Sequence, residues 1–331
     1  MQKTKIEWCD MTSNPIYAVD KATGKRGWFC ERVSPGCAHC YASKLNVRRG
    51  TGHEYLPEHR DKVEFRLNER ELEAILRRKK PTRIFMCDML DLFHEDVPDE
   101  FIARIFATMA LAPQHTFLLL TKRAERMRDY VSSRTAENER GAAFWRYFEG
   151  QDYRPYWPLP NVHLGVSVEN QRFADERIPV LLRTPAAVHF ISAEPLLGPL
   201  DLRKWLKPPI YSADEGTQSY EWPPLNQVIV AGESAGPPER RLVEWCMAHL
   251  TCRMQPAGRR SVGRDLICGE CGALNRWRPK PEALAWVRSI RDQAVAASVP
   301  FFFKGWSGPA PTSGGRLLDG RIWDEYPGEE A

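Results

Sequence analysis

The chain has 331 residues, 43% hydrophobic and 27% charged, which is the composition of a globular protein with a large core. No apolar run is long enough to span a membrane, and the N-terminus lacks the apolar core of a signal peptide, so we expect a cytoplasmic protein with no membrane partner. The net charge of +4 permits a nucleic-acid partner without requiring one.

Three cysteines fall close together in residues 28–41, here named the cysteine loop: Cys30, Cys37 and Cys40. In a reducing cytosol such spacing favours metal over disulfides, and Ser34-Pro35-Gly36 predicts a turn between the first two thiols. Three thiolates suit a four-iron cluster with one iron left open, or a zinc ion with a fourth ligand from elsewhere. Radical S-adenosylmethionine (SAM) enzymes usually have C-x3-C-x2-C, whereas this loop has C-x6-C-x2-C. The spacing therefore leaves cluster and zinc open, and three buried cysteines without metal are a third alternative.

Beyond the loop, short apolar runs alternate with helical patterns. Asn68 and Glu71 form a capping-box pattern before a helical stripe of Leu72, Ile75 and Leu76, and further helices are expected near 101–109, 122–131 and 282–297. The apolar runs are 84–87, 115–121, 162–168, 188–192, 228–231 and 300–304. Continuously apolar strands separated by helices indicate a parallel sheet buried on both faces. We therefore predict an α/β fold, a partial or closed (β/α) barrel of about six parallel strands.

Polar residues stand at or just after the C-terminal ends of these runs. They are Asp88, Thr121, Glu169, Glu194, Glu233 and Lys304. Any one of them could be a helix cap or a loop charge, but the same position in six runs predicts a ligand site, because barrels bind ligands at this rim. Glu169, Glu194 and Lys304 are the candidate catalytic residues.

Several motifs, in this order along the chain, resemble a known family. They are Ile6-Glu7-Trp8-Cys9-Asp10 with Asn14-Pro15, Val33-Ser34-Pro35-Gly36-Cys37-x-x-Cys40-Tyr41, Asp91-Leu92-Phe93, Leu120-Thr121-Lys122, residues 164–170, 194–199 and 232–234, and Phe301-Phe302-Phe303-Lys304-Gly305-Trp306. They cover nearly the whole chain and resemble a phage-associated radical-SAM-like family of unknown function, distantly similar to spore photoproduct lyase.

The resemblance implies a radical SAM barrel in which Cys30, Cys37 and Cys40 hold a [4Fe-4S] cluster and His39 packs near the adenine of SAM. It implies no substrate. The chain has Cys9 where the family usually has threonine, and this residue is either buried or close to the metal. The usual Gly-Gly-Glu after the second strand is missing. Asp88 and Asp91 follow that strand instead, and Gly232-Glu233 comes much later, so the contact to the SAM amine is assigned to neither group. The candidate cofactor-binding residues are His39, Asp88, Ser167, Glu169, Glu194 and Glu233.

Relative to that family, residues 240–280 look inserted, between a barrel segment 1–239 and a final segment 281–331. The insertion contains Cys246, Cys252, Cys268 and Cys271, spaced C-x5-C-x15-C-x2-C, which predicts zinc; an auxiliary iron cluster and no metal are the alternatives. Residues 253–280 hold seven basic against two acidic side chains, and Trp277 suits base stacking. This surface is either a nucleic-acid contact or simply solvated.

Two functions follow. The first is a radical SAM enzyme that cleaves SAM with its [4Fe-4S] cluster, takes electrons from a donor such as flavodoxin or ferredoxin, and modifies a nucleoside or nucleic acid. The second is a zinc-only nucleic-acid-binding protein without catalytic activity. The carboxylates and Lys304 at the predicted rim favour the enzyme, because a binding protein has little use for acids in a barrel mouth.

Overall fold

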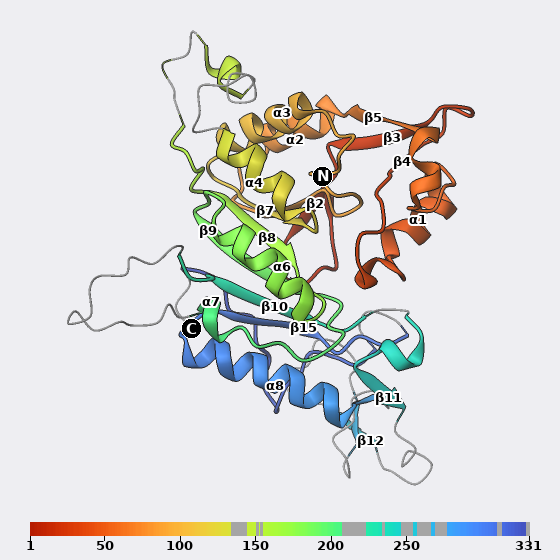
Figure 1. Cartoon of the computed structure of the whole chain (residues 1–331), viewed down its shortest axis with the longest axis vertical. Helices are drawn as coiled ribbons and strands as arrows, with labels where there is room; N and C mark the ends of the chain where they lie inside the picture. The colour runs from red at the N-terminus through yellow and green to blue at the C-terminus, as the bar shows by residue number, and fades with distance from the viewer. Residues whose placement is uncertain are drawn as a thin grey trace, which may run out of the picture. The chain divides into compact units, whose positions relative to one another are not determined.

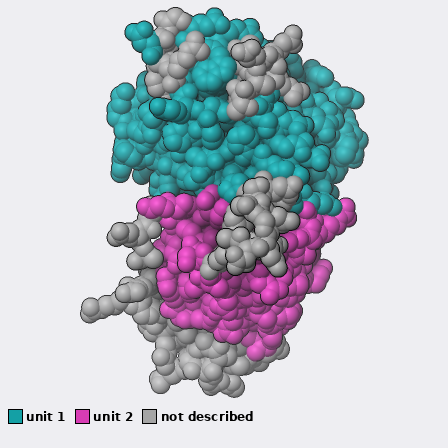
Figure 2. All heavy atoms as spheres, turned by 60° about the vertical axis from the view of Figure 1, so that its left-hand side comes forward, with its two compact units in different colours: residues 1–167, 176–190, 219–223 teal, residues 168–175, 191–218, 224–331 magenta. Residues whose placement is uncertain are grey.

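The computed structural model describes residues 1–133, 144–149, 152, 155–206, 223–233, 236–245, 254–256, 266–268, 277–309 and 313–328. These residues form two compact units, coloured separately in Figure 2. Unit 1 contains the described residues of 1–167 and 176–190, together with residue 223. Unit 2 contains those of 168–175, 191–206 and 224–331.

The main sheet has eight strands in the order β1-β2-β6-β7-β8-β9-β10-β15 (Figure 1). The strands are β1 (Gln2–Lys3), β2 (Met11–Ser13), β6 (Arg83–Met86), β7 (Thr116–Thr121), β8 (Val162–Ser167), β9 (Val188–Ala193), β10 (Gln227–Ala231) and β15 (Phe301–Gly305). The β1–β2 pair is antiparallel, whereas β2–β6, β6–β7, β7–β8 and β10–β15 are parallel. The fold is therefore α/β with a mostly parallel sheet, as predicted.

The six predicted strands are present as β6 to β10 and β15, and they neighbour one another in chain order. The prediction of about six strands is wrong in number, because β1 and β2 extend the sheet beyond β6. Among the described strands, β1 and β15 are the two edges, so the sheet is open. Of the two predicted forms, the closed barrel is therefore wrong. The short β2 carries Thr12 and Ser13, which give it no apolar run to read from sequence.

Burial explains why the apolar runs become inner strands. Every residue of β10 is buried, and Phe301, Phe302 and Phe303 of β15 are completely inaccessible. Strands covered on both faces gain from apolar side chains at every position, which removes the alternation typical of a half-exposed strand. In β8, Gly165 lies against the ring of Phe190 from β9, and a Cβ at this position would overlap that ring.

The helices flank these strands. They are α1 (Tyr41–Arg49), α2 (Glu69–Arg77), α3 (Asp99–Ala110), α4 (Ala124–Ser132), α6 (Gln171–Leu182), α7 (Arg203–Leu206) and α8 (Pro281–Ala296). The four predicted helices are α2, α3, α4 and α8. The predicted capping box is wrong, since the Asn68 side chain makes no cap hydrogen bond and Glu71 instead accepts one from Ser13 Oγ at 2.9 Å. None of the described helices combines the length and apolar character needed to cross a membrane.

A small antiparallel sheet of order β4-β3-β5 precedes α2 in the chain. Its strands are β3 (Ile16–Asp20), β4 (Arg26–Gly27) and β5 (Val63–Leu67). The cysteine loop leaves β4 and ends at the first residue of α1, with a 3-10 turn at Pro35–Cys37 inside it. Further 3-10 turns span Pro57–Lys62, Arg146–Phe148 and Pro238–Arg240.

Two short strand pairs lie in the segment predicted to be inserted. β11 (Val243–Trp245) pairs antiparallel with β14 (Trp277–Pro279), and β12 (Met254–Pro256) pairs antiparallel with β13 (Leu266–Cys268). The pairing of Val243 with Pro279 brings the two ends of this segment together.

Candidate functional site

The cysteine loop is tied to α1 by the fully buried Asn46. Its Oδ1 accepts hydrogen bonds from Trp28 N at 2.9 Å and Thr51 N at 3.1 Å, and its Nδ2 donates to Thr51 Oγ1 and to the His53 carbonyl. Gly27 permits this arrangement, because a Cβ there would overlap Thr51 N and the backbone of Gly50. The start of the loop is therefore fixed by a buried amide and by close backbone packing.

The turn predicted between the first two cysteines is present. Cys37 N donates to Ser34 O at 3.0 Å, and Cys40 N donates to Cys37 O at 3.3 Å. Cys40 is the residue from which α1 begins. Burial raises the pKa of the Cys40 thiol, while the backbone N–H groups of Ser43 and Ala42 act in the opposite direction, as expected for a thiol at a helix N-terminus.

The thiol of Cys30 is strongly desolvated. Although the residue as a whole is half-buried, burial of its thiol raises the pKa of Cys30 to about 12, and the nearby Arg123 charge only partly offsets this. The thiols also influence one another, because a charge on Cys37 raises the pKa of both Cys30 and Cys40. The loop thus brings its three thiols close enough to interact electrostatically, and those of Cys30 and Cys40 are poorly hydrated.

Arg123 and Asp91 lie beside this region. Arg123 Nη1 is 3.7 Å from Cys30 Sγ and 3.3 Å from Asp91 Oδ2. Asp91 is held in turn by Thr121 Oγ1 at 2.7 Å and by Lys122 N at 3.0 Å. Asp91 and Cys30 keep the pKa of Arg123 raised against the effect of its burial, yet its buried Nη2 has no hydrogen-bond partner among the described residues.

Asp88 is presented by a strained turn after β6. The preceding residue, Cys87, is buried with φ of 61°, a left-handed conformation that is uncommon for cysteine and concentrates at functional sites. Asn14 Nδ2 donates to Asp88 Oδ1 at 2.6 Å, and Tyr41 Oη donates to the Asp88 carbonyl at 2.7 Å. Burial raises the pKa of Asp88, while the hydrogen bond from Asn14 acts in the opposite direction. Asp88 is therefore joined to the cysteine loop through Tyr41.

Tyr55 lies close enough to the same region for charges on Cys40 and Cys30 to affect it. It is 3% exposed, and its hydroxyl donates to the Met89 carbonyl at 2.7 Å. Burial raises the pKa of Tyr55 well above its usual value, and charges on Cys40 and Cys30 would raise it further. Tyr55, like Arg123, was not identified from sequence; the only signal is the position of Arg123 directly after Leu120-Thr121-Lys122.

The remaining candidates of the loop and of β8 have simpler surroundings. His39 is half-buried beside Cys40, and Ser167 ends β8, 5% exposed, with its carbonyl accepting from Arg177 Nη1 at 2.7 Å. Cys9 is buried, with its sulfur 3.8 Å from the carbonyl of Ile6. Of the two alternatives for Cys9, burial is the one observed.

In unit 2 the predicted rim residues form ion pairs. Lys304 Nζ binds Glu194 Oε1, and Arg240 makes a bidentate pair with the buried Glu233 at 2.7 and 2.8 Å. The Glu169 side chain is completely inaccessible. Its carbonyl accepts from Leu197 N at 2.8 Å, so the chain after β9 runs beside the residues after β8. Glu169, Glu194 and Lys304 thus belong to one unit, with Glu194 and Lys304 in direct contact.

The second cysteine group lies outside the described residues. Cys246, Cys252 and Cys271 are not described, and Cys268 ends β13, whose side chains are not described either. Within the part of the chain that is described, no group of three or more histidine, cysteine, aspartate or glutamate side chains is arranged to hold a single metal ion. Cluster thiolates do not converge on one ion, because each binds a different iron.

These features define the class of protein: an α/β protein with an open, mostly parallel sheet and a three-cysteine loop beside its N-terminal strands. The chain belongs to the family described as a protein of unknown function (DUF5131), whose model matches residues 3–258 and 261–327. No curated protein and no solved structure matches the chain. The family description assigns no activity, so the resemblance to radical SAM proteins remains a prediction.

Proposed function

We propose that this protein is a radical SAM enzyme in which Cys30, Cys37 and Cys40 hold a [4Fe-4S] cluster, and that it modifies a nucleoside or nucleic acid. The observation that carries the proposal is the grouping of three thiols, of which those of Cys30 and Cys40 are desolvated, with the guanidinium of Arg123 3.7 Å from Cys30 Sγ. Such a cluster, when bound, supplies the electron with which SAM is cleaved.

The chemistry of the three thiols suits cluster ligands better than free thiols. Burial raises the pKa of Cys30 to about 12, so the free thiol is neutral near pH 7, whereas metal ligation removes the proton outright. The thiolates then need positive charge nearby. Arg123 lies 3.7 Å from Cys30, and Lys122 favours the thiolate of Cys40.

The neighbouring residues of unit 1 supply orientation. Asp91 holds Arg123 in place, and Asp88 offers a carboxyl group whose pKa burial raises and whose charged form a ligand amine would stabilise. Glu169, Glu194 and Lys304, all in unit 2, remain the predicted catalytic residues. The electron donor, such as flavodoxin or ferredoxin, remains a prediction from the resemblance.

Anaerobic reconstitution tests the proposal. The wild-type protein should bind about four irons and four sulfides, absorb near 400 nm as cysteine-bound clusters do, and form 5′-deoxyadenosine from SAM after reduction. Cys37→Ala should lose both properties. Cys9→Ala is the matched control, because it also removes a cysteine but one whose sulfur lies against the Ile6 carbonyl. A Cys37→Ala protein with full absorbance and product formation would show that the assignment is wrong.

The second cysteine group has its own test. Cys268→Ser together with Cys271→Ser should remove zinc and weaken nucleic-acid or substrate binding, while the cluster and SAM cleavage persist. Loss of iron from the folded double variant would instead assign an auxiliary cluster to this group.

A further inference from the structure

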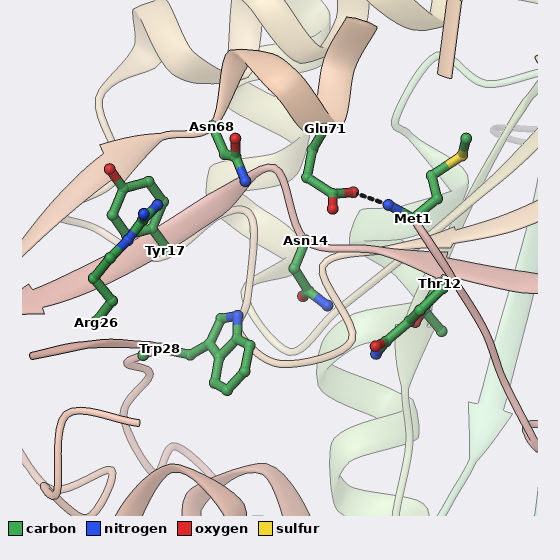
Figure 3. A pocket seen from close by; sticks show the side chains of 10 residues that line it. Met1, Thr12, Asn14, Tyr17, Arg26, Trp28, Asn68 and Glu71 are labelled. Atoms are coloured by element: carbon green, nitrogen blue, oxygen red, sulfur yellow. Dashed lines mark hydrogen bonds and ion pairs between the residues drawn. The ribbon is translucent and has the colours of Figure 1, made fainter. Parts of the chain in front are cut away.

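Unit 1 contains a cavity of about 310 Å³ that the cluster proposal leaves without a role (Figure 3). Its lining residues are Met1, Gln2, Thr12, Asn14, Tyr17, Arg26, Gly27, Trp28, Asn68 and Glu71. They come from β1, β2, β3, β4 and the start of α2. The volume lies at the lower end of small-molecule sites, roughly 300 to 1,000 Å³, and so suits a ligand of about the size of a nucleoside.

One side of the cavity is aromatic. Trp28 is half-buried, and its backbone is fixed by the hydrogen bond from its N–H to Asn46, so the indole is held at its base. Tyr17 carries the guanidinium of Arg26 over its ring, with Cζ 3.9 Å from the ring centre. A planar heterocycle gains most from such surroundings, because every nucleobase presents a face that stacks on an aromatic side chain.

The other side is polar and rich in acceptors. Asn68 and Glu71 reach the cavity from α2, opposite the indole of Trp28 (Figure 3). The Asn68 side chain makes no cap hydrogen bond with its own helix. Glu71 Oε2 accepts from Ser13 and from the amino group of Met1, so both of these contacts use the same oxygen and leave Oε1 for a ligand.

Thr12 adds a hydroxyl at the floor of the cavity. It is 1% exposed, and its hydrogen-bonding hydroxyl lies beside Asp88 and acts to lower the pKa of that residue. A hydroxyl both donates and accepts, so it also offers an acceptor to a polar ligand in the cavity.

We propose that this cavity binds a nucleoside whose base carries an exocyclic amino group, with the ring stacked on Trp28 and the amino group donating to Glu71 Oε1. A carboxylate only accepts hydrogen bonds, so it favours an amino group and repels a carbonyl at the same position. Adenine, guanine and cytosine meet this requirement, whereas uracil and hypoxanthine present a carbonyl.

The cavity is connected to the cysteine loop. Asn14 lines the cavity and donates to Asp88, whose carbonyl accepts from Tyr41, the residue after Cys40. The inference deepens the proposed function by naming a substrate class. It rests on that function for one point only, namely that the bound nucleoside is the substrate of the enzyme. Binding itself needs neither iron nor SAM.

Equilibrium dialysis with the full-length, metal-free protein tests the inference, using adenosine, guanosine, cytidine, uridine and inosine as probes. The first three should bind more tightly than the last two. Trp28→Ala should weaken binding by about five- to a hundredfold, the usual effect of losing one stacking partner, and Trp28→Tyr should retain most of it. Tyr156→Ala is the matched control, because Tyr156 is 87% exposed and does not line the cavity.

Glu71→Gln tests the selection of the amino group, because glutamine keeps the shape but adds a donor. The preference for cytidine over uridine and for adenosine over inosine should fall about tenfold. Equal binding of amino and carbonyl bases to the wild type, unchanged binding in folded Trp28→Ala, or no nucleoside binding at all would overturn the inference. Because the binding assay contains no iron, a negative result in it would contradict the inference without affecting cluster assembly or SAM cleavage. Conversely, a protein that forms no cluster and cleaves no SAM could still bind nucleosides, so the two proposals can fail separately.

Discussion

The guanidinium of Arg123 lies 3.7 Å from the sulfur of Cys30, although the two residues are 93 positions apart in the chain. The contact joins the end of β7 to the cysteine loop inside unit 1. It also links two buried groups whose charges need each other, because burial disfavours both the thiolate and the guanidinium. We regard this pair as the electrostatic centre of the candidate site.

Removing the charge of Arg123 should weaken iron binding. Arg123→Met keeps much of the apolar stem but leaves the Cys30 thiolate without its nearest positive charge, and residues behind metal ligands typically contribute about 10- to 100-fold in metal affinity. Competition of the reconstituted protein with a chelator measures the change. Arg128→Met is the control, since Arg128 pairs with Asp129 on the surface. Equal iron retention in Arg123→Met and wild type would contradict the assigned role.

Gly27 should not tolerate a side chain. A Cβ in Gly27→Ala would overlap Thr51 N and Gly50, so the backbone must move and the hydrogen bonds of Asn46 must lengthen. We expect a loss of about 2 to 4 kcal/mol in the free energy of unfolding, the range of a disrupted buried contact. Gly198→Ala is the control, because the nearest atom to its Cβ is 4.0 Å away.

The same Gly27→Ala variant should also expose the cysteine loop. In the metal-free protein, alkylation of the loop thiols should become faster than in wild type, because Asn46 no longer holds Trp28 and the start of the loop. Wild-type stability together with wild-type alkylation rates would show that this anchor is not needed.

The elements that sequence predicted and those that it missed differ in the range of their interactions. The strand at Phe301, Phe302 and Phe303 was predictable because burial on both faces requires apolar residues throughout. The three-residue β2 was not, because it is defined by pairing with β6, more than 70 residues later. Glu71 matched a local capping pattern, but Ser13, 58 residues away, recruits its carboxylate.

The candidate site shows the same division. Spacing and a local turn were enough to single out the cysteine loop, since ligands for one group must lie close together. The role of Arg123 depended on a contact across 93 residues, and in the sequence only its place directly after Leu120-Thr121-Lys122 distinguishes it from other basic residues after strands. Asp88 was predictable from its place after β6, whereas its link to Asn14 required the fold.

Lys304 and Glu194 should be coupled energetically. Their side chains are 19% and 28% exposed, so either single substitution removes the opposite charge from a partly buried group. Lys304→Met and Glu194→Gln should each destabilise by about 1 to 3 kcal/mol, and the double variant by less than their sum. Urea unfolding of the four proteins measures the coupling.

A surface pair in the same unit serves as the comparison for this cycle. Lys204 and Asp175 are 62% and 47% exposed, and the same cycle on them should give a coupling of about 0 to 1 kcal/mol. If Lys304 and Glu194 couple no more strongly than this surface pair, their contact is not part of a built site.

His163 should make stability depend on pH. Burial lowers the pKa of His163 to about 4 from its usual 6.5, and its Nδ1 is buried without a hydrogen-bond partner among the described residues. Between about pH 6.5 and pH 4, His163 is therefore protonated in the unfolded chain but not in the folded chain. The contribution of His163 to stability is complete above pH 6.5 and is lost as the pH falls toward 4.

For His163 alone, the expected loss between about pH 7.5 and about pH 5 is roughly 2 kcal/mol, because each unit of pKa difference corresponds to about 1.4 kcal/mol and not all of it is realised at pH 5. Urea unfolding at both pH values measures it. Other buried histidines add to the total, so the informative quantity is the difference between wild type and His163→Phe, which keeps an aromatic ring but cannot titrate. The variant should lose about 2 kcal/mol less than wild type over this range, and an equal loss in both proteins would mean that His163 is protonated in the folded state.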